Sequence, residues 1–321
     1  MSPRLDLALQ SGLVLSHPLT VIGPTDAADL SALPSQTQVV QPFKPFHDHF
    51  AAQGFSVVPD AHEPCQDAIV FLPRAKALAH SRVQQACARA GGVVVVDGAK
   101  TDGVDSLLKD IRNRVAVQGP ISKAHGKIFW FQADCQAFTD WAAPEHQAVD
   151  GFQTAPGVFS ADGIDPASAL LQAALPDKPG ARLADLGAGW GFLSAGLLQA
   201  AGLKTLHLVE ADHAALTCAR ANVTDPRAQF HWADAVTWRA PEPLDTVVMN
   251  PPFHTSRSAD PTLGQGFITS AARNLIRNGT LWMVANRHLP YETTLNGTFA
   301  QVEEVTGDNR FKVFRASRPR R

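Results

Sequence analysis

The chain has only four cysteines among its 321 residues, and none of them forms a Cys-x-x-Cys pair or a Cys-His zinc pattern. This argues against a structural zinc site and is typical of a protein of the reducing cytosol. His47-Asp48-His49 is the stretch most like a metal-binding pair, but no third ligand stands at helical or hairpin spacing. We therefore predict a solvated turn there, no bound metal and a cytoplasmic protein.

Long apolar runs and a strong net charge are also missing. No apolar stretch approaches the roughly 20 residues that a membrane-spanning helix needs. The start, MSPRLDLALQSGLVLSHP, is only modestly apolar and contains Asp6, which disfavours a signal peptide. The formal net charge is −2, so charge alone does not indicate a nucleic-acid partner. Six of the last twelve residues are basic, and this segment either meets phosphate or is merely solvated.

Length and composition predict two folded domains. Domains usually run about 100–200 residues, and 45% hydrophobic with 18% charged residues is typical of a globular protein. Between residues 140 and 156, proline, glycine and polar residues follow one another without periodicity, as in a linker. We expect one domain over residues 1–145 and a second over residues 151–321.

The second half alternates short apolar strands with amphipathic helices. LADLG, TLHLVE, QFHWAD, LDTVVMN and TLWMVAN predict strands, and GFITSAARNLIRN predicts a helix that stops at Gly279. AQVEEVTGD and RFKVFRAS predict a terminal antiparallel pair. Such alternation is typical of an α/β fold with a mostly parallel sheet and helices on both faces.

The first half repeats this alternation in DAIVFLPR, ALAHSRVQQACARA and GGVVVVDG. Its first strand is also followed by a proline, but Leu72-Pro73-Arg74 replaces the Asn-Pro-Pro-Phe of the second half, and no glycine-rich loop lies upstream. Two interpretations stay open. Either the chain is an internal duplication whose first copy has lost its catalytic parts, or two unrelated α/β domains look alike.

A glycine-rich loop, Asp185-Leu186-Gly187-Ala188-Gly189-Trp190-Gly191, follows a predicted strand and opens a helix. Glycines there permit a tight turn and let the backbone approach a ligand closely. The spacing differs from the G-x-G-x-x-G fingerprint of dinucleotide sites, and no Walker lysine follows, which disfavours phosphoryl transfer.

Two further acids end the next strands. Glu210 stands 19 residues after Gly191, where a carboxylate can accept hydrogen bonds from ribose hydroxyls. Asp234 ends the third strand and is suited to an adenine amino group. Either acid alone is also explained as a helix cap, and for Asp234 taken singly the cap is favoured. Together with Asp185 beside the glycine loop, they favour a cofactor that carries adenosine.

The strand TVVM ends in Asn250-Pro251-Pro252-Phe253-His254. The prolines stop ladder pairing and fix the backbone at the sheet edge where α/β proteins bind ligands. The side-chain carbonyl of Asn250 and the backbone carbonyl of Pro251 are two acceptors for the N–H groups of a planar amine. Phe253 offers a flat face, and stacking of a base on such a ring contributes about 1–3 kcal/mol. The tetrapeptide therefore indicates a site for a planar amine, and it resembles the (N/D)PP(F/Y/W) motif of methyltransferases that act on planar nitrogen.

The order of the glycine loop, Glu210, Asp234 and Asn-Pro-Pro-Phe resembles the class I S-adenosylmethionine-dependent methyltransferases. More narrowly, PGVFSADGIDPASALLQAAL, NPPFH, VANRHLPYETTL and RFKVFRA resemble the bacterial ribosomal RNA guanine-N2 methyltransferases of the RsmC/RlmG type. The resemblance implies two tandem Rossmann-like class I methyltransferase domains with mostly parallel sheets and helices on both faces. It also implies that the N-terminal domain is degenerate, binds no cofactor and has a structural or RNA-docking role.

The resemblance also assigns roles to residues. It implies S-adenosyl-L-methionine as the cofactor, with binding residues Phe159, Ser160, Asp185, Gly187, Ala188, Gly189, Gly191, Glu210, Ala211, Asp234, Ala235 and Asn250. It implies catalysis by Asn250, Pro251, Pro252 and Phe253. It implies contact with the guanine or its surrounding RNA by Phe253, His254, Arg310, Phe311 and Lys312. Glu210 stands where an aspartate is more usual, a change that keeps the ribose acceptor.

We therefore predict methyl transfer to the exocyclic N2 of a guanine in ribosomal RNA, with 16S-type RNA of the small subunit favoured. The expected partner is ribosomal RNA or a ribosomal subunit, and a monomer is favoured. N-methylation of a protein glutamine or of adenine N6 follows the same tetrapeptide logic and stays open. So does a non-catalytic RNA-binding scaffold.

Overall fold

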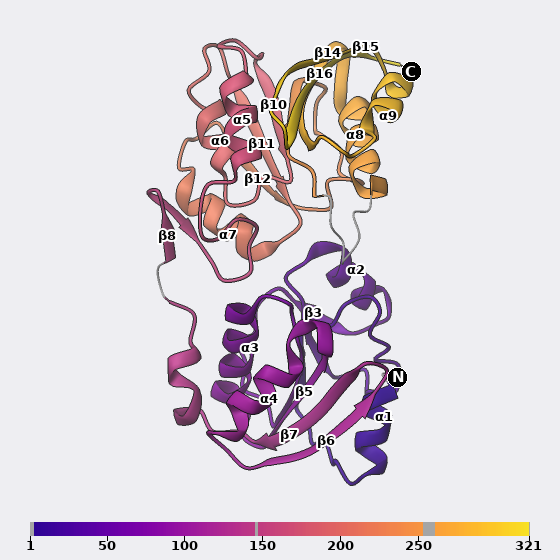
Figure 1. The fold of residues 1–321 in the computed structure, drawn as a ribbon, viewed down its shortest axis with the longest axis vertical. Helices are drawn as coiled ribbons and strands as arrows, with labels where there is room; N and C mark the ends of the chain where they lie inside the picture. Colours follow the sequence, from indigo (N-terminus) through magenta and orange to yellow (C-terminus); the bar gives the residue numbers. More distant parts are fainter. Residues whose placement is uncertain (1–2, 145–146, 253–260, 321) are drawn as a thin grey trace. The chain divides into compact units, whose positions relative to one another are not determined.

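The structure is a computed structural model that describes residues 3–144, 147–252 and 261–320. The chain divides into two compact units, residues 1–145 and residues 146–321, called here the N-terminal and the C-terminal unit. Each unit contains its own seven-stranded sheet (Figure 1).

The sheet of the N-terminal unit has the strand order β3-β2-β1-β4-β5-β7-β6. Its first five strands are parallel, and β7 is antiparallel to both of its neighbours. The strands are β1 (Leu19–Ile22), β2 (Gln38–Val40), β3 (Ser56–Val58), β4 (Asp67–Phe71), β5 (Val93–Ala99), β6 (Val117–Lys123) and β7 (Gly126–Gln132). The helices are α1 (Pro3–Gln10), α2 (Lys44–Ala52), α3 (Lys76–Arg89) and α4 (Val104–Arg112), with short 3₁₀ turns at Lys100–Asp102 and Gln136–Trp141.

The C-terminal unit begins with a small hairpin, and its large sheet has the order β12-β11-β10-β13-β14-β16-β15. The hairpin strands are β8 (Gln147–Val149) and β9 (Phe152–Thr154). The sheet strands are β10 (Arg182–Leu186), β11 (Thr205–Glu210), β12 (Ala228–Trp232), β13 (Leu244–Met249), β14 (Leu275–Asn286), β15 (Phe299–Gly307) and β16 (Phe311–Pro319). The helices are α5 (Pro166–Ala174), α6 (Phe192–Leu197), α7 (His213–Asn222), α8 (Pro261–Asn274) and α9 (Tyr291–Thr298).

Counted from the first sheet strand of each unit, both sheets have the same order, 3-2-1-4-5-7-6. The last two strands of the C-terminal unit pair antiparallel, as the sequence predicts. Helices cover both faces of each sheet because successive strand residues point to opposite sides. In β5, for example, Val94 packs with α3 and α4, whereas Val95 packs with α1 and α2. In the C-terminal unit, α8 and α9 cover one face, and α5, α6 and α7 cover the other. The predicted tandem α/β fold is thus confirmed.

The strand order of the C-terminal unit reverses between β10 and β13, which is where open α/β sheets bind ligands. Leu186 at the end of β10 pairs with Met249 at the end of β13. Gly187 and Asn250 are the next residues of the two strands, so both lie at the carboxyl edge of the sheet at this reversal.

Helix α8 ends at Asn274 and not at Gly279, so the predicted helix end was wrong. The Asn274 side chain accepts a hydrogen bond from the Ala240 N–H at 2.8 Å and donates one to the Ser270 carbonyl at 2.9 Å. Asn274 therefore uses its side chain to hydrogen-bond the last turn of the helix. Leu275 is buried and begins β14 opposite Leu244. Pairing with the sheet therefore overrides the helical periodicity of the sequence.

Two further local predictions need correction. His47-Asp48-His49 lies within helix α2 and not in a turn, because a proline occupies the first turn and Lys44 pairs with Asp48 one turn later. The predicted linker contains the hairpin β8–β9, whose strands are only three residues long. Within the described residues, no helix is both long and apolar enough to cross a membrane.

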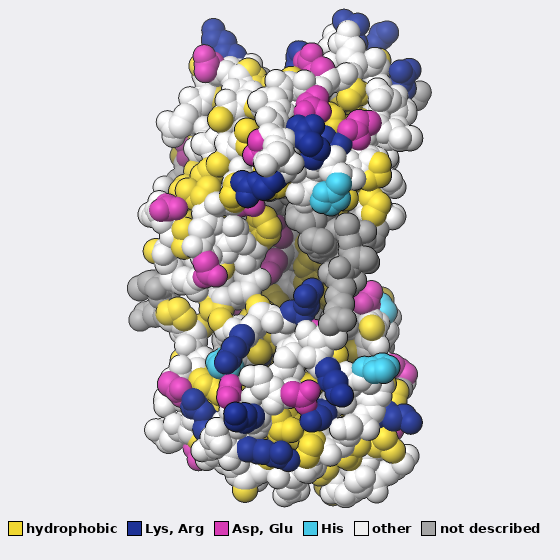
Figure 2. Space-filling model, viewed as in Figure 1, with side chains coloured by type: hydrophobic (Ala, Val, Ile, Leu, Met, Phe, Trp, Pro, Cys, Tyr) yellow, Lys and Arg dark blue, Asp and Glu magenta, His cyan; other side chains and the backbone are white. Residues whose placement is uncertain are grey.

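Lys and Arg side chains are scattered among acidic ones on the face of the molecule that Figure 2 shows. In the N-terminal unit, Arg114 pairs with Asp140, and Lys127 pairs with Asp105. Basic side chains of this unit are thus partly neutralised by neighbours, in keeping with the net charge of −2.

Candidate active site

The glycine loop after β10 adopts a backbone that other residues rarely enter. Gly187, Gly189 and Gly191 have φ angles of +75°, +57° and +94°. A Cβ atom on Gly191 would lie 3.1 Å from Val223 Cγ2, because the loop packs against the end of α7. A Cβ atom on Gly189 would meet no atom within 4 Å. The loop is therefore packed on one side and leaves open space beside Gly189.

Glu210 braces this loop from the end of β11. One carboxylate oxygen accepts a hydrogen bond from the Gly189 N–H at 2.8 Å, and the other accepts from the Asp212 N–H at 2.8 Å. Burial raises the pKa of Glu210 to about 7, although these backbone donors oppose the shift. The carboxyl therefore changes charge near neutral pH.

Asp185 lies beneath the loop rather than in an open site. It is fully buried, and its carboxylate accepts a hydrogen bond from the Ser194 hydroxyl at 2.7 Å. Burial raises its pKa to about 7. Because Ser194 belongs to α6, Asp185 joins the strand before the loop to the helix after it.

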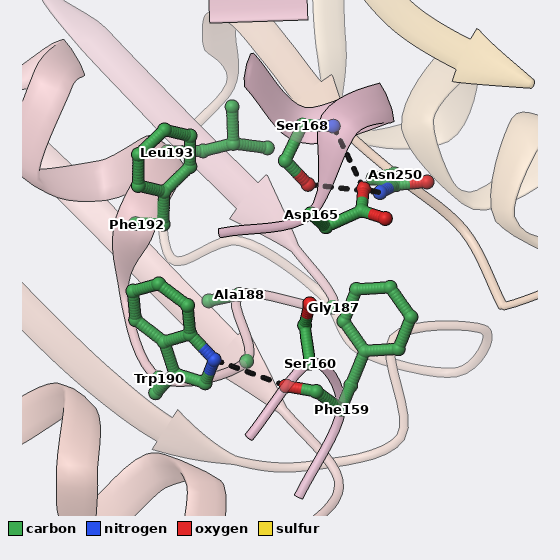
Figure 3. A pocket seen from close by; sticks show the side chains of 11 residues that line it. Phe159, Ser160, Asp165, Ser168, Gly187, Ala188, Trp190, Phe192, Leu193 and Asn250 are labelled. Carbon is green, nitrogen blue, oxygen red and sulfur yellow. Dashed lines mark hydrogen bonds between the residues drawn. The ribbon is translucent and has the colours of Figure 1, made fainter. Parts of the chain in front are cut away.

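A cavity opens at the carboxyl edge of β10 and β13 (Figure 3). Three segments enclose it: the loop before α5, the glycine loop with the start of α6, and the end of β13. Its lining consists of Phe159, Ser160, Asp165, Ser168, Gly187, Ala188, Gly189, Trp190, Phe192, Leu193 and Asn250.

Asn250 is held in this wall by its amide nitrogen. Nδ2 donates to Asp165 Oδ2 at 2.9 Å and to Ser168 Oγ at 2.9 Å (Figure 3). The side-chain oxygen is consequently at the opposite end of the amide from these two partners. Sequence reasoning missed Asp165 and Ser168, which lie more than 80 residues before Asn250 in the chain.

Phe159 places an exposed aromatic ring beside the cavity. Its side chain is 58% exposed, which is unusual for phenylalanine, while its carbonyl accepts a hydrogen bond from Trp190 Nε1 at 3.0 Å. Ser160 follows in the left-handed region at φ +54° and donates its hydroxyl proton to the Gly163 carbonyl at 2.7 Å. Backbone contacts therefore fix this segment while the ring stays accessible.

The residues predicted to bind cofactor fall into two groups. Six line the cavity: Phe159, Ser160, Gly187, Ala188, Gly189 and Asn250. Six do not: Asp185, Gly191, Glu210, Ala211, Asp234 and Ala235. Asp234 accepts a hydrogen bond from the Val236 N–H at 2.8 Å, and the Ala211 carbonyl accepts one from Trp232 Nε1 at 2.9 Å. These groups support the turns that follow β11 and β12.

The predicted catalytic and substrate residues are only partly described. Pro251 is buried and Pro252 exposed directly after Asn250, whereas Phe253 and His254 lie outside the described residues. Asn286 at the end of β14 pairs with Phe311, which places the start of β16 at the same sheet edge as Asn250.

Arg310 and Lys312 flank Phe311 but differ in exposure. The guanidinium of exposed Arg310 lies 5.0 Å from the centroid of the Phe311 ring. Lys312 is buried, with 4% of its surface exposed, and its ammonium pairs with Glu292 of α9. Only Arg310 of these two cations presents its charge to solvent.

The cavity lining suits S-adenosylmethionine better than a dinucleotide. It carries the carboxylate of Asp165 and the hydroxyls of Ser160 and Ser168, and none of its described residues is a lysine or arginine. A ligand with sulfonium and ammonium charges matches such a wall, whereas a pyrophosphate lacks cationic partners in it. In residues 3–144, 147–252 and 261–320, no three His, Cys, Asp or Glu side chains gather in a way that would hold a metal ion.

Comparison with known proteins gives consistent similarities. The methyltransferase small domain family matches residues 150–315 of this chain. The ribosomal RNA small subunit methyltransferase C of Acinetobacter baylyi is 27% identical over 338 residues, covering 98% of this chain and 99% of its own length. The protein of the same name from Shewanella baltica is 28% identical over 269 residues, covering 80% of this chain and 77% of its own.

Among solved structures, the guanine-1207 N2 methyltransferase of 16S rRNA (RsmC) from T. thermophilus, in complex with AdoMet and guanosine, is similar with a TM-score of 0.79. It is 22% identical, and the alignment covers 98% of this chain and 92% of that protein. At this identity the likeness establishes the fold, and it extends over both units.

Proposed function

This chain belongs to the methyltransferase small domain family, and on that basis we propose that it transfers a methyl group from S-adenosylmethionine to the N2 amino group of a guanine in 16S ribosomal RNA. The resemblance drawn from the glycine loop and Asn-Pro-Pro-Phe is confirmed by this family membership. The names of the relatives support the small subunit, and the T. thermophilus protein suggests the guanine that corresponds to position 1207.

The observation that carries the proposal is the fixed amide of Asn250 at the edge of the cavity. The nitrogen of a guanine amino group is a weak nucleophile because its lone pair is delocalised into the ring. Asn250 Oδ1 and the Pro251 carbonyl are the two acceptors we assign to its N–H groups. Their hydrogen bonds favour a pyramidal nitrogen whose lone pair is free to react.

When bound, S-adenosylmethionine supplies a methyl group that is electrophilic because it is attached to a sulfonium sulfur. We assign Gly187, Ala188 and Gly189 to its amino-acid end, because these residues line the cavity beside Asn250. Glu210, at the end of β11, is assigned to the ribose hydroxyls, and Asp234, two residues after β12, to the adenine. Asp185 and Gly191 act indirectly, through the shape of the loop.

We propose that the N-terminal unit binds no cofactor, and the side chain of Arg82 supports this. Its guanidinium donates to the Phe71 carbonyl at the end of β4, over 3.1 Å, and to the Gly23 carbonyl after β1, over 3.5 Å. A Cβ atom on Gly23 would lie only 2.1 Å from Arg82 Nη1. Arg82 thus occupies the sheet reversal that corresponds to the cavity between β10 and β13.

The partner we propose is the small ribosomal subunit or its RNA, in the cytoplasm, where ribosomes assemble. Arg310 and Phe311 are assigned to the RNA around the target base, since they lie at the same sheet edge as Asn250. A flipped or unpaired guanine is required, because the N2 of a stacked, paired base stays inside the helix and cannot reach Asn250.

The test is transfer of labelled methyl from S-adenosylmethionine to small subunits, large subunits and naked 16S RNA that lack the modification, followed by nucleoside analysis. We expect N2-methylguanosine in small-subunit RNA and none in large-subunit RNA. Asn250→Ala is the control, expected to bind cofactor and to lose transfer. With the wild-type protein, the formation of N6-methyladenosine, label in protein, or no transfer despite cofactor binding would each contradict the proposal.

A further inference from the structure

The amide of Asn250 has two ends of nearly equal shape and opposite chemistry. The oxygen accepts hydrogen bonds, and the nitrogen donates two. In the structure, Nδ2 meets two acceptors, Asp165 Oδ2 and Ser168 Oγ, each at 2.9 Å. A flipped amide would instead set its oxygen against a carboxylate oxygen. The two partners therefore determine which end of the amide remains available.

We propose that Asp165 and Ser168 are positioning residues that lock the Asn250 amide with Oδ1 facing the amino group of the substrate. This rests on the function proposed above and adds two residues to its machinery. Without the lock, the amide is free to turn its NH₂ group toward the substrate amine. Two donors would then face each other, and the acceptor that the reaction needs would be lost.

The start of α5 makes this lock rigid. Asp165 is the N-cap of the helix, and its Oδ2 accepts the Ser168 N–H at 2.8 Å as well as the Asn250 amide. Pro166 at the first helical position restricts the backbone next to the cap. Ser168 is buried, with 8% of its surface exposed. Both acceptors are therefore held by the helix before any substrate arrives, as preorganised catalysis requires.

The negative charge of the Asp165 carboxylate also helps to stabilise the positive charge that develops on the substrate nitrogen. In the reaction, guanine N2 forms a bond to the methyl carbon while the carbon–sulfur bond breaks and leaves its electron pair on sulfur. The nitrogen carries positive charge until it releases one proton to solvent. A carboxylate that accepts the Asn250 N–H increases the negative charge on Oδ1, because linked hydrogen bonds polarise one another. Oδ1 thereby becomes a better acceptor as the charge develops.

A direct role in holding the cofactor is the competing explanation, since Asp165 and Ser168 both line the cavity. The two explanations differ in what a substitution changes. A cofactor contact would weaken cofactor binding, whereas the lock would lower the rate of transfer and release the Asn250 amide. Measurements of the cofactor Kd, of kcat and of the amide itself therefore separate them.

Four substitutions form matched pairs. Ser168→Ala removes the hydroxyl, and Ser168→Thr keeps it. Asp165→Ser keeps an N-cap of equal strength but is too short to reach Asn250. Asp165→Asn keeps an oxygen for both hydrogen bonds and removes only the charge. We expect Ser168→Ala and Asp165→Ser to lower kcat by about 10-fold or more, the effect of one lost hydrogen bond at a reacting centre. Ser168→Thr is expected to retain most of kcat, and Asp165→Asn is expected to lose less of it than Asp165→Ser, because only the charge is removed.

A nuclear magnetic resonance measurement tests the lock without turnover. In protein labelled with ¹⁵N-asparagine, the Asn250 side-chain signal is the one that disappears in Asn250→Asp. We expect its two protons to exchange slowly with water in the cofactor-free wild type and in Ser168→Thr. They should exchange faster in Ser168→Ala and in Asp165→Ser, because each variant frees one N–H.

A double-mutant cycle completes the test. If Ser168 acts through Asn250, then Ser168→Ala causes no further loss of kcat in an Asn250→Ala background. Equal losses in cofactor affinity and rate, with unchanged exchange of the Asn250 amide, would overturn the proposal. Failure of the proposed function would be seen differently, as a wild-type enzyme that methylates no guanine while the exchange experiment still reports the state of the amide.

Discussion

Gly189 donates its backbone N–H to the carboxylate of Glu210 over 2.8 Å, and this bond joins the glycine loop after β10 to the end of β11. The second oxygen of Glu210 accepts the Asp212 N–H, and Asp212 in turn caps α7 by accepting the Ala214 N–H at 2.9 Å. One carboxylate thus sets the loop and the following helix relative to each other.

The first prediction concerns the charge of Glu210. Burial raises its pKa to about 7, and only the ionised form accepts hydrogen bonds with both oxygens. Cofactor affinity is therefore expected to rise by up to about 10-fold between pH 6 and pH 8, as the carboxyl ionises. Glu210→Gln should bind more weakly and lose this part of the pH dependence. Calorimetry at several pH values checks it.

The pH dependence that remains in Glu210→Gln belongs to other groups, including the amino group of the cofactor. Subtracting the pH profile of cofactor affinity of Glu210→Gln from that of the wild type leaves the contribution of Glu210. Parallel profiles for wild type and Glu210→Gln would show that the carboxyl does not titrate in this range or does not contact the cofactor.

The second prediction compares two glycines of one loop. Gly189→Ala places a methyl group in the open space beside the cavity, at a φ of +57° that alanine tolerates at a cost of about 1–2 kcal/mol. Gly191→Ala has the less favourable φ of +94° and a 3.1 Å approach to Val223, so we expect a loss of about 2–3 kcal/mol.

The same two substitutions should affect cofactor affinity in the opposite order: Gly189→Ala should lower it more than Gly191→Ala does. Gly189→Ala is expected to weaken binding at least about 10-fold, which corresponds to about 1.4 kcal/mol, because the methyl group enters the ligand's space. Gly191→Ala, once folded, should bind more nearly as wild type does. Urea denaturation and calorimetry measure the two quantities. Normal binding by a stable Gly189→Ala would place the cofactor elsewhere.

The third prediction concerns the two cations that flank Phe311. Arg310 is exposed, so Arg310→Ala should weaken RNA binding. The slope of log binding constant against log salt concentration should become shallower by about 1, the effect of one lost phosphate contact. Lys312 is buried and paired with Glu292, so Lys312→Met should leave RNA affinity nearly unchanged. Binding isotherms at several salt concentrations check both. An equal loss in Lys312→Met would mean that this side chain leaves Glu292 to reach the RNA.

Much of the C-terminal unit was predictable from local patterns. Apolar strands that end in Asp185, Glu210 and Asn250 indicate the edge where these residues gather, because parallel strands end together. The glycines at positive φ could be anticipated from their spacing. The end of α8 could not, because Leu275 pairs with β13, a contact across about 30 residues of chain.

The lock on Asn250 shows a different limit. Asp165-Pro166 is a recognisable helix start, with an N-cap acid and a proline at the first position. The sequence therefore indicates one partner of Asp165, the N–H of Ser168. Its second partner, Asn250, is 85 residues away, and only the sheet order brings α5 beside the end of β13. A cap with a second role cannot be distinguished from an ordinary cap without the fold.

The last prediction concerns Asp185 and the stability of the protein. Burial raises its pKa to about 7, against an ordinary value of 3.8, so between these pH values the folded protein holds one more proton at this site than the unfolded chain. The free energy of unfolding must therefore fall as pH rises through this range, by at most about 1.4 kcal/mol per pH unit from this group. Above pH 7 the loss is complete.

Asp185→Asn removes this titration, so its stability relative to wild type should rise from pH 4 to pH 7 and then stay constant. Ser194→Ala should extend the fall of the free energy of unfolding to higher pH, because the Ser194 hydroxyl favours the ionised carboxyl and its loss raises the pKa of Asp185 further. Burial lowers the pKa of His207 to about 4 and also that of His231, and both titrate equally in all three proteins, so they cancel in the difference. Urea denaturation at each pH measures the free energies. A difference that does not change with pH would mean that Asp185 titrates alike in the folded and unfolded chain, and that it is hydrated rather than enclosed beneath the loop.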